Sequence, residues 1–185
     1  FADSVGNLSS IGNICSYLKN QGHDVSTKTV SSYLNYFAEA YLIYPVHRFD
    51  LHGKKILESN DKLYFEDIGL RNIIAGGERN SDIEKIIENA VYLHLVNLGY
   101  KVAVGQLRAG EVDFVCVKTN DRRYVQVAYI VADEKTEARE FGRLKNINDN
   151  YPKYVISMTP LVKRSDHEGI IHLGLREFLK NGFGN

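Results

Sequence analysis

The architecture of this chain is encoded most clearly between Ser81 and Val131, in the stretch SDIEKIIENAVYLHLVNLGYKVAVGQLRAGEVDFVCVKTNDRRYVQVAYIV. Its first part repeats apolar residues at the spacing of one helix face, and Gly99 is placed to end that helix. Three segments rich in β-branched and aromatic residues follow, separated by polar loops. The stretch therefore predicts one helix and then three strands, at 100–106, 112–118 and 124–131.

The residues that follow extend this pattern. A polar helix is expected over 133–148, a strand over 151–158, a short edge strand over 169–173 and a closing helix over 175–180. The order is α-β-β-β-α-β with one extra strand and helix. It predicts an α/β domain with a mixed central sheet, of the restriction-endonuclease-like, or PD-(D/E)XK, type.

The N-terminal part shows a different pattern. Helical spacing is found over 8–21 and again over 27–42, with Ser26 as the N-cap of the second helix. Two strand-like segments follow, at 43–49 and 62–67. A helix-turn-helix followed by two strands predicts a winged helix. We place the boundary in the glycine-bearing segment 75–80, which gives a winged-helix domain over 1–78 and a nuclease-like domain over 79–185.

Composition limits the function. The chain has 185 residues, and its 23 Lys and Arg balance its 23 Asp and Glu, so it lacks the basic excess of a dedicated nucleic-acid binder. Apolar residues make up 44%, but no apolar run is long enough to cross a membrane, and we find no signal peptide. Cytoplasmic location is expected. Because the chain starts at Phe1 inside patterned sequence, we expect it to be part of a longer protein.

The nuclease-like pattern specifies where chemistry would lie. Such enzymes place an acid on the first helix, an aspartate on the second strand and Glu-x-Lys on the third. The positions that match here are, in order, Glu88, Glu111 with Asp113, and Gln126 with Ala128. Carboxylate oxygens bind hard cations such as Mg²⁺. A tentative Mg²⁺ site is therefore predicted from Glu88, Glu111, Asp113 and Gln126.

The same positions argue against catalysis. Gln126 offers a neutral amide oxygen, which is a weaker ligand than a carboxylate, and Ala128 stands where the lysine should be. Losing such a charged group commonly costs orders of magnitude in rate. The nearest lysines in sequence stand at no motif position: Lys101, Lys118 and Lys135. The alternative is that Glu88 is a surface or salt-bridged residue and that Glu111 and Asp113 are structural, for example as partners of Arg108.

The residues also predict a nucleic-acid contact. Lys28 lies on the second helix of the helix-turn-helix, which is the usual DNA reader. Three further cations lie around the predicted hairpin: Arg48, Lys54 and Lys55. They would contact phosphates. The alternative that we favour is that this unit packs between two domains.

Several segments together resemble a known family. They are Glu88-Asn-Ala-Val-Tyr-Leu-His-Leu-Val-Asn-Leu-Gly-Tyr100, Gly110-Glu-Val-Asp-Phe114, Tyr124-Val-Gln-Val-Ala128, Arg139-Glu-Phe141 and Asn150-Tyr-Pro-Lys-Tyr154. In this combination the chain resembles the C-terminal region of a prokaryotic AAA-type P-loop ATPase family. The resemblance implies an ATPase domain before this region and a PD-(D/E)XK-like domain that often lacks a complete catalytic set.

These observations leave three hypotheses. The favoured one is a non-catalytic interaction or nucleic-acid-recognition module. Its expected partner is the missing ATPase domain, another protein or DNA. The sequence is also compatible with an oligomer. The second is a metal-dependent nuclease with an altered site, and the third is a DNA-binding regulator that acts through the winged helix. The chain has no Gly-x-x-x-x-Gly-Lys-Ser/Thr motif, so ATP is implied only for the missing domain, and no cofactor is expected in this chain.

Overall fold

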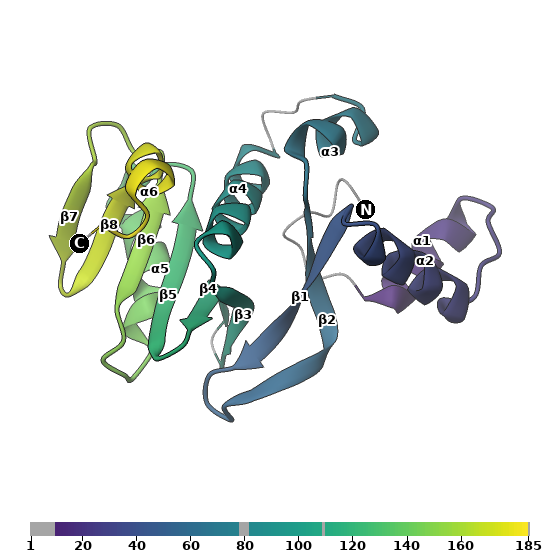
Figure 1. The fold of residues 1–185 in the computed structure, drawn as a ribbon, viewed down its shortest axis with the longest axis horizontal. Helices are drawn as coiled ribbons and strands as arrows, with labels where there is room; N and C mark the ends of the chain where they lie inside the picture. The colour runs from purple at the N-terminus through teal and green to yellow at the C-terminus, as the bar shows by residue number, and fades with distance from the viewer. Residues whose placement is uncertain (1–9, 78–81, 109, 185) are drawn as a thin grey trace.

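The computed structural model describes residues 10–77, 82–108 and 110–184. It shows an α/β fold whose eight-stranded mixed sheet has the order β2-β1-β3-β4-β5-β6-β8-β7 (Figure 1). Its elements are α1 (Ile11–Asn20), α2 (Thr27–Glu39), β1 (Ile43–Asp50), β2 (Lys55–Phe65), α3 (Ile68–Ile74), α4 (Ile83–Asn97), β3 (Lys101–Leu107), β4 (Gly110–Lys118), β5 (Asp121–Ala128), α5 (Glu134–Lys145), β6 (Lys153–Ser157), β7 (Arg164–His167), β8 (Ile170–Gly174) and α6 (Leu175–Asn181).

The first two helices form a pair that projects from one end of the sheet (Figure 1). The predicted N-cap is confirmed, because the Ser26 side chain accepts a hydrogen bond from the Thr29 N–H. α2 is shorter than the predicted 27–42. Tyr41 adopts a left-handed backbone with φ of 54°, and the Leu42 N–H then bonds the Phe37 carbonyl. This left-handed residue ends the helix at Glu39.

The hairpin of β1 and β2 belongs to the central sheet. Its strands pair antiparallel, and β1 also pairs in parallel with β3 through Arg48, Phe49 and Asp50. The sheet is therefore continuous across the predicted boundary at residue 78. Residues 78–81 lie outside the described residues, and the division into domains over 1–78 and 79–185 stays a prediction.

Two elements of the described chain were not expected from the sequence. Asp67 caps α3, but this helix has only seven residues, with Gly69 in its first turn, which is too short for a clear helical period. β7 is four residues long, mostly exposed and polar, and it is held by antiparallel pairing with β8. Both elements depend on pairing or capping rather than on a hydrophobic pattern.

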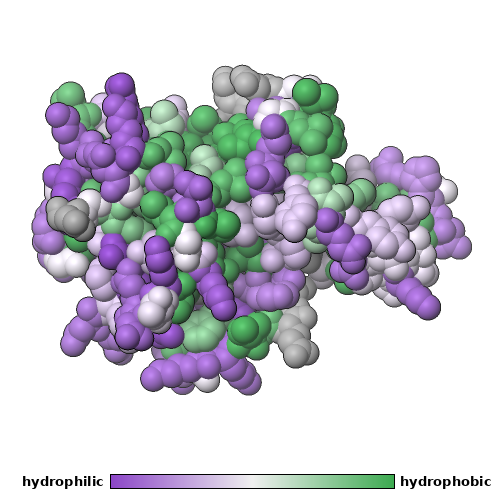
Figure 2. Space-filling view, in the orientation of Figure 1, coloured by the Kyte–Doolittle hydropathy of each residue, from purple (hydrophilic) through white to green (hydrophobic). Residues whose placement is uncertain are grey.

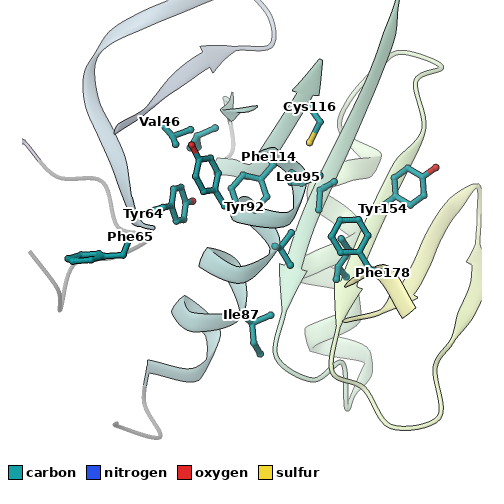
Figure 3. Close-up of a cluster of buried hydrophobic side chains, with 14 of the residues drawn as sticks. Val46, Tyr64, Phe65, Ile87, Tyr92, Leu95, Phe114, Cys116, Tyr154 and Phe178 are labelled. Atoms are coloured by element: carbon teal, nitrogen blue, oxygen red, sulfur yellow. The ribbon is translucent and has the colours of Figure 1, made fainter. Parts of the chain in front are cut away.

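The helices cover both faces of the sheet. On one face α4 and α6 pack through Ile87, Leu95 and Phe178, in a cluster that includes aromatic residues of the strands (Figure 3). On the other face α5 contributes Phe141 and Leu144 to a second cluster. Among the described residues, no helix is long and apolar enough to span a membrane.

The β1–β2 hairpin contacts α4 through stacked aromatic rings and through the side-chain amide of Asn89. The rings of Tyr64 and Tyr92 are stacked at 4.5 Å between centroids, with Phe114 beside them (Figure 3). Asn89 on α4 accepts a hydrogen bond from the Phe65 N–H and donates one to the Phe65 carbonyl, both at 2.8 Å. Asn89 therefore satisfies two buried backbone groups of the last residue of β2.

Replacing Asn89 by alanine should lower the free energy of unfolding by about 2–4 kcal/mol, because the Phe65 N–H and carbonyl lose their partners in a buried setting. Urea unfolding of N89A would measure the loss. The matched control is N97A, at an exposed asparagine on the same helix. Equal stability of the two variants would contradict the assigned role of Asn89.

Candidate functional site: a buried ion cluster

The predicted acidic residues Glu88 and Asp113 lie close together. Glu88 is in the first half of α4, and Asp113 is on β4 at a β-bulge. Gly105 pairs with Val112 and Ala103 pairs with Val115, so Asp113 and Phe114 together face the single residue Val104. Such a bulge redirects a side chain locally. Phe114 packs in the α4-side cluster, and Asp113 reaches the same side of the sheet.

A lysine that sequence analysis did not single out stands between these two acids. Lys62 of β2 places its Nζ 3.0 Å from Glu88 Oε1 and 3.6 Å from Asp113 Oδ1. The three side chains are only 7%, 15% and 10% exposed, respectively. The Tyr64 hydroxyl donates a further hydrogen bond to Glu88 Oε1 at 2.5 Å. We call Lys62, Tyr64, Glu88 and Asp113 the ion cluster.

The backbone of β5 completes the ion cluster. The Val127 N–H donates to Asp113 Oδ2 at 2.8 Å, while Lys62 approaches the other oxygen. Both carboxylate oxygens of Asp113 are thus engaged by positive or partly positive groups. These contacts stabilise the charged carboxylate in a nearly dry environment, where an unpaired charge would be costly.

The two motif positions on β5 lie on the other side of the sheet. Gln126 pairs in register with Val155, and Ala128 pairs with Ser157. Val155 packs against Phe141 of α5, so side-chain alternation places Gln126 and Ala128 on the α5 face. The Gln126 side chain contacts Asp113 through the backbone: its Oε1 atom accepts a hydrogen bond from the Asp113 N–H at 3.4 Å. The structure therefore brings Glu88 and Asp113 together and does not bring Gln126 to them.

Burial and pairing shift the pKa values of the ion cluster. Burial raises the pKa of Glu88 to about 7, with a further rise from Asp113 that Lys62 and Tyr64 partly offset. Burial alone would lower the pKa of Lys62, but Glu88 and Asp113 outweigh it and raise that pKa. Burial and the charge of Glu88 raise the pKa of Tyr64. Lys62 is therefore a permanent cation at neutral pH.

These contacts bear on the predicted Mg²⁺ site. The Glu111 carboxylate is 3.4 Å from Arg48 Nη2, and the Lys62 ammonium lies between Glu88 and Asp113. In the described part of the chain, no group of three or more Asp, Glu, His and Cys side chains is arranged to hold an ion. The donor set fits an internal ammonium ion better than a divalent metal, which prefers several free oxygens.

The predicted nucleic-acid-binding residues have different surroundings. Lys28, Lys54 and Lys55 are exposed, at the start of α2 and at the β1–β2 turn. Arg48 is only 16% exposed and contacts both Glu111 and the Gln106 side chain. Arg48 is therefore committed to contacts within the protein. A DNA contact by the three lysines stays a prediction.

Comparison with known proteins adds relatives without a described activity. A family model described as "Domain of unknown function (DUF8612)" matches residues 1–81. An uncharacterized protein of Haemophilus influenzae is 35% identical over 84% of this chain and 38% of its own length. Uncharacterized protein MJ1544 of Methanocaldococcus jannaschii is 31% identical over 76% of this chain and 31% of its own length. The chain thus spans about a third of the length of these relatives.

Among solved structures, the crystal structure of protein VC1899 from Vibrio cholerae is similar over 92% of this chain and 48% of its own chain. The sequence identity is 13% and the TM-score is 0.34.

Removing the lysine of the ion cluster should be costly. In K62M the buried Glu88 and Asp113 lose their counter-charge, and we expect a loss of about 3 kcal/mol in the free energy of unfolding at pH 8. The control is K101M, at an exposed lysine on β3. Urea unfolding compares the two variants. A K62M variant as stable as K101M would show that the ion cluster does not contribute to the stability of the fold.

The raised pKa of Glu88 gives a pH signature with a definite sign. Between about pH 4.5 and 7 the folded protein holds a proton on Glu88 that the unfolded chain has released, so stability falls as pH rises through this window. E88Q removes this contribution. The stability of E88Q minus that of the wild type should therefore increase from pH 5 to pH 8 in urea unfolding. A difference that stays constant or decreases would refute the assignment.

Proposed function

We propose that this chain is a non-catalytic interaction module, made of a winged helix-turn-helix joined to a restriction-endonuclease-like αβββαβ domain whose acidic site has been closed. One observation carries the proposal. The Lys62 ammonium lies 3.0 Å from Glu88 and 3.6 Å from Asp113, between the two carboxylates that would otherwise hold a metal.

The electrostatics of the ion cluster support a structural role. A metal-dependent nuclease needs carboxylate oxygens that are free to coordinate an ion and to leave it sites for water and phosphate. In this protein a divalent ion would have to displace a buried ammonium group. It would also find Gln126 on the opposite face of the sheet. Charge pairing within the protein has taken the place of metal binding.

We further propose that the chain is the C-terminal part of an AAA-type ATPase in the cytoplasm. The motif residues from Glu88 to Tyr154 support this, and so does the greater length of the relatives. In this proposal ATP binds only to the preceding domain, and the present chain carries the contacts to its partner. The parent protein then has an enzymatic activity that this part of it does not perform.

The exposed surface favours a partner-binding role. Leu70, Ile73 and Ile74 of α3 are 40%, 77% and 55% exposed, and apolar side chains gather around this helix at the top of Figure 2. Tyr33 and Tyr36 on α2 are 56% and 61% exposed. Apolar residues gathered on a surface often mark contact sites, and tyrosine is enriched at interfaces.

A cleavage assay tests the proposal directly. The 185-residue chain is incubated with single-stranded DNA, double-stranded DNA and RNA in Mg²⁺ or Mn²⁺, with D113A as the matched control. Because the acidic site is closed, we expect no metal-dependent cleavage by the wild-type chain and no difference between it and D113A. Cutting by the wild type that D113A abolishes would overturn the non-catalytic proposal.

The position of Lys62 also favours a second candidate function. A metal-dependent nuclease could use Lys62, supplied by β2, in place of the lysine missing at Ala128, since its ammonium lies within 3.6 Å of Asp113. The same assay separates the candidates. This second function requires cleavage that is lost in both K62M and D113A and retained in K101M.

A further inference from the structure

A second site lies away from the ion cluster, where the β1–β2 turn meets the loop that follows α5. A partly open cavity of about 270 Å³ is lined there by residues far apart in sequence. His52 and Lys54 come from the turn, Arg122 from the start of β5, and Asn148 and Tyr151 from the loop. The cavity has room for about nine waters at liquid volume, so it exceeds the needs of one small ion.

Positive charge dominates the lining of this cavity. Lys54 is exposed, and among the described residues neither Lys54 nor Arg122 lies within ion-pair distance of a carboxylate. Asp149 is the acidic residue in the lining, and its carboxylate is held by contacts within the protein. It accepts hydrogen bonds from the Tyr124 hydroxyl at 2.5 Å and the Tyr151 N–H at 3.2 Å. The Lys153 ammonium lies 3.9 Å from it.

Arg122 is held in place by two rings. Its guanidinium lies 5.6 Å from the centroid of Phe49 and 5.3 Å from that of Tyr151. Such contacts fix the guanidinium plane. Arg122 also donates a hydrogen bond to the Tyr124 side chain, and its remaining N–H groups are available to an anion. Tyr151 remains 44% exposed, so part of its ring is available for stacking. The cavity thus combines cations with a planar aromatic surface.

We propose that this cavity binds a nucleoside monophosphate, either free or as the terminal nucleotide of a single strand. Lys54 and Arg122 bind the phosphate, with His52 beside them, and the base lies against Tyr151. Guanidinium groups suit phosphate oxygens, and bases stack on aromatic and arginine planes. The two sources present the same group to the cavity. The site is independent of the ion cluster and of the proposed interaction role.

Calorimetric titration of the 185-residue chain with AMP, adenosine and inorganic phosphate tests the proposal. We expect one AMP per chain, with inorganic phosphate about tenfold weaker, adenosine weaker still, and an affinity that falls with added salt. A 5′-phosphorylated trinucleotide that binds tighter than AMP identifies a strand end as the source. A trinucleotide that binds no tighter identifies the free nucleotide.

The hairpin provides a matched pair of variants, because Lys54 and Lys55 are adjacent and exposed but only Lys54 lines the cavity. K54Q should weaken the binding of AMP at least fivefold, and K55Q should leave the affinity for AMP within twofold of the wild type. Y151A should weaken the binding of AMP but not that of inorganic phosphate. Absence of AMP binding, or an equal effect of K54Q and K55Q, overturns the site. AMP that binds no tighter than phosphate overturns the contact with Tyr151.

Discussion

The buried ammonium of Lys62 is the contact on which the arrangement of this protein depends. It joins β2, α4 and β4 at one point, through Glu88 and Asp113, although these elements are distant in sequence. A buried charge without a partner costs several kcal/mol, so the position of each of these three elements constrains the other two. Two further contacts join β2 to α4 beside this point. They are the stacking of Tyr64 on Tyr92 and the hydrogen bonds between the Asn89 amide and the Phe65 backbone. The hairpin is therefore fixed to the rest of the sheet by specific polar contacts as well as by strand pairing.

The pairing of strands decides which predicted residues meet. Glu111 and Asp113 stand two residues apart on β4, so alternation places them on one face, and the pairs Arg48–Glu111 and Lys62–Asp113 are consistent with this. Gln126 was expected beside them, but its register with Val155 on β6 turns it toward α5. A spacing motif specifies positions along a strand. It does not specify which face of the sheet each position occupies, because that depends on the partner strand.

Most helices and strands follow from local patterns, because apolar spacing, N-caps and glycine ends act over a few residues. The N-cap at Ser26 and the end of α4 before Gly99 are examples. Local patterns do not predict the contact between Lys62 and Glu88, because these residues are 26 positions apart in sequence. The lysines that lie near the motif in sequence are Lys101, Lys118 and Lys135. The lysine that reaches the acids comes from an earlier strand, and only the tertiary fold brings it there.

The hairpin also explains how a chain with zero net charge can carry local charge. It places Lys62 against the acids on the α4 face and Lys54 at a cavity whose other walls come from β5 and the loop after α5. At the first place the cation is neutralised within the protein. At the second, neither Lys54 nor Arg122 lies within ion-pair distance of a carboxylate of the described residues, so neither cation is paired within the protein. Net charge therefore says little about anion binding here, because the balance of 23 and 23 is reached over the whole chain and not at each site.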